Sequence, residues 1–126
     1  PFNVTGATMR IGIWVSGIPR PTHQELAGRV DVGDGTSALH NHSTHVAGTL
    51  AAAGLDNSAR GMAPAARLYA CDYNSDTAEM AEVAADAPDQ TNRLYLSNHS
   101  YGYLTGWHGS YWYGTWVLPE DERFGR

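Results

Sequence analysis

Short apolar segments of strand character alternate along the chain with segments of helical character, and this alternation limits most strongly what the chain can fold into. Residues 9–15, 67–73 and 93–98 (MRIGIWV, RLYACDY, RLYLSN) are apolar and rich in β-branched or aromatic side chains, as buried strands are. Residues 42–53 and 75–87 lie between them, consist largely of helix formers, and are followed by Gly54 and Pro88. This order predicts parallel strands joined by crossover helices. We therefore expect an α/β layered domain, with its site at the carboxyl ends of the strands, near Val15, Tyr73 and His99.

The remaining segments are predicted to be mostly loops. Residues 22–30 have the composition of one or two helical turns, and residues 31–41 are rich in glycine, aspartate and serine, as loops are. Residues 56–64 form a further predicted loop. Residues 101–126 place three tryptophans and four tyrosines among glycines without a clear period. We expect a hairpin or a surface excursion there.

Composition excludes several classes of protein. The chain has 126 residues, enough for one compact domain, and its net charge of −5 is spread without a basic stripe, which argues against a nucleic-acid partner. No apolar run approaches the roughly 18 residues of a membrane helix. The N-terminus has no signal-peptide pattern, so we expect any such segment to be removed or to lie upstream. Cys71 is the single cysteine, which excludes an internal disulfide, and we expect a buried, inert thiol.

Four sequence blocks carry a resemblance to a known family. Residues 42–49 (HSTHVAGT) differ at one position from the HGTHVAGT block around the catalytic histidine of subtilases. RIGIWVSGI resembles the first core strand of that family, GMAPAARLYA the segment leading into the next strand, and SNHSYG the strand that lines the substrate cleft. The chain therefore resembles the N-terminal half of a subtilisin-like serine peptidase, over nearly its whole length up to Gly102.

The resemblance implies a fold and a domain assignment. It implies a three-layer, subtilisin-like parallel sheet with flanking helices that is incomplete in this chain. Residues 1–126 would be the N-terminal part of a catalytic domain, with about 101–126 as an aromatic-rich insertion or surface excursion. It also implies an extracellular or cell-envelope location.

The same resemblance implies residue roles. His42 would be the general base of a Ser/His/Asp mechanism that hydrolyses peptide bonds. Ser100, Tyr101 and Gly102 match the cleft-lining positions, where a polypeptide substrate in an extended conformation pairs by backbone hydrogen bonds like an added strand.

Two positions depart from the family pattern. Val15 stands where the family has the aspartate that orients the catalytic imidazole, and valine has no acceptor to offer. Asp31 or Asp34, upstream of His42, is an alternative source of that carboxylate. Ser43 stands where the family has glycine, and its hydroxymethyl group is expected to crowd the neighbouring strand or the cleft.

The nucleophile block of the family, GTSMAxP, is absent. Residues 35–38 (GTSA) precede His42 and lack the methionine and proline, so Ser37 is assigned to turn chemistry. Asn98 does not correspond to the family's oxyanion-hole asparagine. We expect a missing C-terminal half to carry the serine, and this chain alone to be inactive. The alternative is a pseudoprotease that keeps the groove and binds polypeptide without cutting it.

A metal site is not expected. His40, His42 and His45 form an HxHxxH pattern that is similar to a zinc cluster, but neither a carboxylate at zinc-protease spacing nor a CxxC pair completes it. Residues 56–60 are too short for the calcium loop of subtilases, and no DxDxDG pattern is present. We expect no cofactor, and we interpret His99 and His108 as polar cleft or surface residues.

Overall fold

A parallel sheet of four strands organises the chain in the computed structural model, which describes residues 4–85, 93–102 and 106–113. Strands β1 (Arg10–Val15) and β3 (Arg67–Asp72) lie in the centre, and β2 (Val30–Val32) and β4 (Leu94–His99) lie at the two edges, in the order β2-β3-β1-β4. Every neighbouring pair is parallel. Because parallel strands need crossover connections, the intervening segments must pass over the faces of the sheet.

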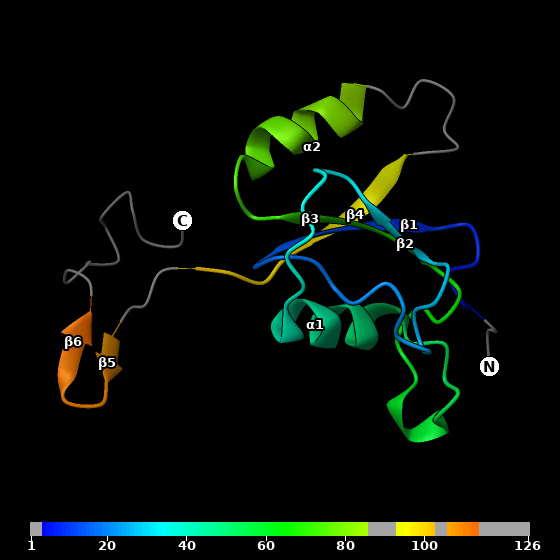
Figure 1. Ribbon diagram of the computed structural model, residues 1–126, viewed down its shortest axis with the longest axis horizontal. Coiled ribbons are helices and arrows are strands. Elements are labelled where there is room, and N and C mark those ends of the chain that lie inside the picture. Colours follow the sequence, from blue (N-terminus) through cyan, green and yellow to red (C-terminus); the bar gives the residue numbers. More distant parts are fainter. Residues whose placement is uncertain (1–3, 86–92, 103–105, 114–126) are drawn as a thin grey trace.

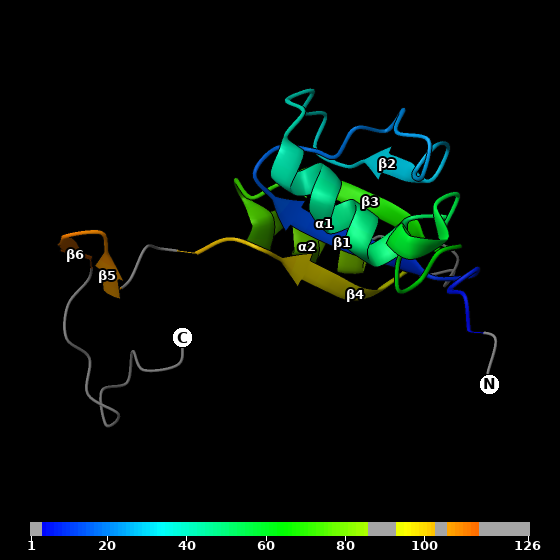
Figure 2. The same ribbon diagram turned by 90° about the horizontal axis from the view of Figure 1, so that it is seen from below.

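Two helices make these crossovers on opposite faces. Figure 1 shows α1 (Asn41–Ala51) on one side of the sheet and α2 (Asp76–Ala85) on the other, and Figure 2 shows α1 lying over β1 and β3. The layered α/β class predicted from the sequence is therefore confirmed. α1 begins one residue before and ends two residues before its predicted bounds, α2 begins one residue after its predicted start, and the predicted end of α2 at Ala87 and Pro88 lies outside the described residues.

The core lies between α1 and the sheet. Ile11 and Ile13 alternate along β1 and pack with Ala47 and Ala51 of α1, all of them at most 6% exposed. Small side chains on α1 allow its backbone to lie close to the strands. Trp14 lies on the opposite face, is fully buried, and donates its indole N–H to Glu79 of α2 over 2.8 Å. Both helices are thus fixed to the same central strand.

Residues 22–33 differ from the sequence prediction. No helix forms over residues 22–29, which make turns, and β2 begins at Val30, so the predicted loop at 31–41 starts within this strand. This short strand pairs with residues 68–70 of β3, so a tertiary contact decides its conformation rather than a local period. The predicted loop at 56–64 also contains one 3₁₀ turn, Asn57–Ala59.

The described part of the aromatic tail is an antiparallel hairpin. Strands β5 (Gly106–His108) and β6 (Tyr111–Tyr113) pair with each other, and Trp107 contacts Trp112 edge-to-face. The predicted hairpin is therefore present over residues 106–113. Trp107 is 71% exposed. Residues 114–126 lie outside the described part. Neither described helix has the length and apolar character needed to cross a membrane.

Candidate functional site

The carboxyl ends of β1 and β4 and the amino end of α1 meet at one edge of the sheet. Val15 is the last residue of β1 and His99 the last of β4. His40 caps α1 and accepts a hydrogen bond at Nδ1 from the backbone N–H of His42 over 3.2 Å. His42 is therefore held in the first turn of α1 with its side chain exposed, as an imidazole that acts on a ligand must be.

Ser43 joins α1 to the loop that follows β1. Its side chain is fully buried, and its Oγ lies 2.6 Å from the carbonyl oxygen of Ser16 and 3.1 Å from that of Gly17. The hydroxyl therefore fits without displacing the neighbouring strand, contrary to the expectation from sequence. Gly17 adopts φ 65°, and a Cβ added to it would lie 2.4 Å from the carbonyl oxygen of Ala38. Only glycine fits this close approach of the two backbones. The loop after Val15 is thus fixed against the start of α1.

The Nε2 atom of His42 lies 3.0 Å from the carbonyl oxygen of Ser100. A carbonyl oxygen can only accept, so Nε2 carries the proton in this contact. The contact joins α1 to the segment after β4, and brings together the predicted base and the first residue of the predicted substrate strand.

The other two predicted cleft residues lie in different surroundings. The hydroxyl of Tyr101 donates to the carboxylate of Asp76 at the start of α2, and its ring contacts Tyr73 at 5.6 Å between centroids. Gly102 is exposed, and an added Cβ would meet no atom within 4 Å. The structure therefore places Ser100 beside His42 and turns the Tyr101 side chain toward α2.

Val15, which the sequence predicts at the position that orients the catalytic imidazole, supplies no carboxylate. Its side chain is 0% exposed. Asp31 pairs with Arg67 at 2.7 Å, and Asp34 accepts the backbone N–H groups of Thr36 and Asp72 at 3.0 and 2.7 Å. Both alternative carboxylates are therefore engaged with groups other than the imidazole of His42.

The three histidines of the HxHxxH pattern do not form a common ligand group. The ring centroids of His40 and His42 are 6.4 Å apart and the rings are nearly perpendicular. Among the described residues, the three side chains that bring potential ligand atoms within 4.8 Å of one another are Asp34, Cys71 and Glu79. Nothing in the arrangement of these histidines favours a zinc site.

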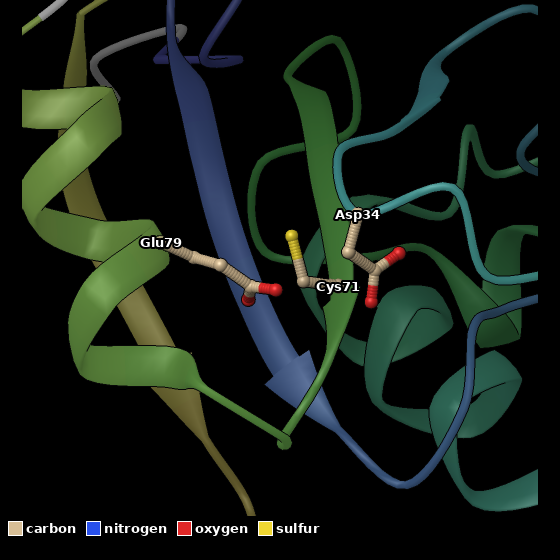
Figure 3. A group of neighbouring side chains, drawn as sticks. All are labelled: Asp34, Cys71 and Glu79. Atoms are coloured by element: carbon tan, nitrogen blue, oxygen red, sulfur yellow. The ribbon is translucent and has the colours of Figure 1, made fainter.

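The group of Asp34, Cys71 and Glu79 was not predicted from the sequence, because its members come from a loop, β3 and α2. Figure 3 shows Glu79 extending from α2 toward Cys71 on β3, with Asp34 in the loop that follows β2. Burial, together with the charges of Glu79 and Asp34, raises the pKa of the Cys71 thiol to about 12. The thiol therefore stays protonated at neutral pH, as an inert core residue does.

Glu25 is a second residue whose role the sequence did not indicate. It is 6% exposed, and its carboxylate accepts the backbone N–H groups of Asp56, Leu55 and Gly54 at 2.9, 3.0 and 2.7 Å. These hydrogen bonds, that of Asp56 first, lower the pKa of Glu25 although burial opposes them. Glu25 thus fixes the loop that follows α1, although about thirty residues of sequence separate Glu25 from that loop.

Comparison with known proteins identifies one family. The model of the subtilase family matches residues 19–117, which is most of the chain. No curated protein and no solved structure matches it. The match includes α1, β3 and β4, and it begins just after Val15 and the loop that Ser43 fixes.

Proposed function

The chain belongs to the subtilase family, and from this premise we propose that it is part of a serine endopeptidase in which His42 is the general base. The subtilase family consists of serine peptidases, which act on polypeptides. The observation that carries the proposal is the position of His42 in the first turn of α1, 3.0 Å from the Ser100 carbonyl oxygen. A base there faces a strand against which an extended peptide can lie.

The substrate is proposed to lie along residues 100–102. Ser100 adjoins the imidazole, and Gly102 leaves open space above the backbone. An extended peptide beside this segment would present a scissile carbonyl near His42, with backbone hydrogen bonds fixing its register. The chemistry then follows the serine-peptidase scheme: the base removes the serine proton, the serine oxygen attacks the carbonyl, and the imidazolium returns the proton to the leaving amine.

The nucleophile is proposed to come from a C-terminal half of the domain outside these residues. Two features of β4 support this arrangement. The strand lies at the edge of the described sheet, and Tyr95 and Leu96 on it are 54% and 59% exposed. A further parallel strand and its helices would pair with this edge and cover these side chains. An extracellular or cell-envelope location is part of the same proposal and rests on the family alone.

A peptide-binding protein without peptidase activity is the second candidate, and one observation favours it. Val15 is fully buried at the orienting position, while Asp31 and Asp34 bind other groups. Nothing among the described residues then holds a proton on Nδ1 of His42. A groove that keeps Ser100 and Gly102 would still bind an extended peptide.

Assembly with the serine-carrying half of a subtilase catalytic domain tests the first candidate. The two polypeptides are produced together, co-purification verifies their assembly, and cleavage of a fluorogenic peptide is measured. We expect Val15→Asp to raise turnover by roughly 10⁴-fold, the size of the effect known for a subtilisin that lacks this aspartate, and His42→Ala to abolish it. An assembled Val15→Asp protein that is no faster than Val15→Asn would reject this role for Val15, and unchanged peptide binding would then favour the second candidate.

A further inference from the structure

A second histidine forms a hydrogen-bonded chain on the opposite face of the sheet from α1. Ser97 and His99 are two residues apart on β4, so their side chains point to the same face. This is the face of Trp14, which pairs in register with His99, and of α2. Asp76, the first residue of α2, and Tyr101 complete the group, which we call the Ser97 relay.

The relay links its four side chains in one order, from Ser97 through His99 and Tyr101 to Asp76. His99 Nε2 lies 3.1 Å from Ser97 Oγ, and His99 Nδ1 lies 3.0 Å from the hydroxyl oxygen of Tyr101. The Tyr101 hydroxyl donates to a carboxylate oxygen of Asp76. That oxygen lies 3.9 Å from His99 Nδ1, so tyrosine bridges the imidazole and the acid.

The protons of the relay can be placed from these contacts. An ionised carboxylate only accepts, so the single hydroxyl proton of Tyr101 is directed to Asp76. The Tyr101 oxygen is then an acceptor for Nδ1–H of His99, and the lone pair of Nε2 faces the hydroxyl of Ser97. This is the tautomer that a general base requires, and it is the reverse of the one at His42.

The orientation of the His99 ring is fixed by packing as well as by hydrogen bonds. The ring stacks on Trp14 with 5.5 Å between centroids and 3° between planes, and Trp14 is fully buried. Tyr101 also packs edge-to-face against His99 at 5.7 Å. A base held in this way keeps its Nε2 directed at Ser97 without a cost in side-chain freedom at each turnover.

A pocket of about 350 Å³ adjoins the serine. Ser97, which is exposed, forms part of its wall, and α2 and β4 supply mainly apolar side chains to the rest. The apolar members of the wall are Trp14, Met80, Val83, Ala84, Leu94 and Leu96. Arg93 and Tyr95 complete the wall, and the apolar remainder of a pocket of this size accepts a short acyl or aryl group.

We propose that Ser97 is a nucleophile that accepts the acyl group of small carboxylic esters, with His99 as its base. The Ser97 oxygen bonds to the ester carbonyl carbon while its proton moves to His99 Nε2. The bond from that carbon to the alcohol oxygen then breaks, and the proton passes from Nε2 to the leaving alcohol. Water attacks the acyl-serine by the same steps, which releases the carboxylic acid and restores the Ser97 hydroxyl.

In this scheme Ser97 and His99 touch the reacting atoms, and Tyr101 and Asp76 are positioning residues. The site does not use His42 or a peptide groove, because it lies on the α2 face of the sheet and its nucleophile is present in the chain. The proposal concerns the 126-residue chain by itself, because the C-terminal half of the proposed peptidase would cover Leu96, which belongs to the wall of this pocket.

Two measurements on the 126-residue chain test the proposal. The first treats the chain with a fluorophosphonate probe and locates the modified residue by peptide mass spectrometry. We expect modification at Ser97, its loss in Ser97→Ala, and its retention in Ser58→Ala, a matched control in which the serine bonds a carboxylate but no imidazole. Absence of modification at Ser97 overturns the proposal.

The second measurement follows hydrolysis of p-nitrophenyl butyrate. We expect His99→Gln to lower kcat by at least about 100-fold, with His45→Gln, an exposed histidine on α1, as the unchanged control. Tyr101→Phe should lower kcat about 10-fold or more and leave KM unchanged, because it removes the hydroxyl that links His99 to Asp76 and keeps the ring. Full activity of His99→Gln, or a Tyr101→Phe effect confined to KM, contradicts the relay. Circular dichroism of each variant verifies that its fold is retained.

Discussion

The Nε2 atom of His42 donates its proton to the carbonyl oxygen of Ser100 over 3.0 Å. A general base in a serine peptidase needs the opposite arrangement, with the proton on Nδ1 and a lone pair on Nε2. The family aspartate enforces that arrangement by accepting from Nδ1, and Val15 has no group that can do so. The contact with Ser100 therefore favours the unreactive tautomer, and valine at the position predicted for the family aspartate does not oppose it.

Replacing Ser43 by alanine is expected to destabilise the chain by about 1 kcal/mol. The buried hydroxyl of Ser43 donates to the carbonyl oxygens of Ser16 and Gly17, and alanine removes this donor. Urea unfolding measures the change in the free energy of unfolding. Thr49→Ala in the same helix is the control, because its exposed hydroxyl bonds only to the carbonyl of His45 within the helix, and it should change stability by less than about 0.5 kcal/mol. Equal effects of the two substitutions would contradict a special role for Ser43.

Glu25 is expected to make stability depend on pH in the acid range. Its three backbone hydrogen bonds exist only in the folded chain, so its pKa is lower in the folded than in the unfolded state. The resulting stabilisation is complete above the ordinary pKa of about 4.5 and is lost as the pH falls through the lower folded value.

Urea midpoints at several pH values measure this dependence. Glu25→Gln should be less stable than the unchanged chain at pH 7, and the difference should narrow as the pH is lowered below about 4.5. Glu82→Gln on the exposed side of α2 is the control and should leave the midpoint unchanged at both ends of the range. A difference for Glu25→Gln that stays constant with pH would show that these hydrogen bonds do not set the titration.

Replacing Gly102 by proline is expected to weaken binding of an extended peptide about 10-fold, because proline removes one backbone N–H from the proposed pairing strand. Fluorescence polarisation with a labelled peptide measures the Kd. Gly102→Ala is the matched control, since it keeps the backbone N–H that proline removes and its Cβ meets no atom of the chain, so its Kd should change less than that of Gly102→Pro. Undiminished binding by the proline variant would place the peptide elsewhere.

The elements predicted correctly from the sequence are those whose pattern of apolar residues matches the face that is buried in the fold. Ile11 and Ile13 alternate on a strand with a buried face, so β1 is recognisable from seven residues. β2 was missed because Val30–Val32 is too short to show a period and forms by pairing with β3. Contacts between distant segments explain this difference.

The candidate site was predictable where a sequence block marks it and not where side chains meet across the fold. The block around His42 predicted the helix start and the imidazole within it. The hydrogen bond from Ser43 to Ser16 joins residues 27 apart, and that from Trp14 to Glu79 joins residues 65 apart. No local pattern encodes such pairs. The roles of His42, Ser100 and Gly102 in a reaction remain predictions.

The most direct test of the account is the tautomeric state of His42, measured from the ¹⁵N chemical shifts of its imidazole in the 126-residue chain above pH 8. We expect the unchanged chain to carry the proton on Nε2, and Val15→Asp to move it to Nδ1, with Val15→Asn as the matched control. A proton that stays on Nε2 in a folded Val15→Asp chain would contradict the claim that Val15 occupies the position from which the catalytic imidazole is oriented.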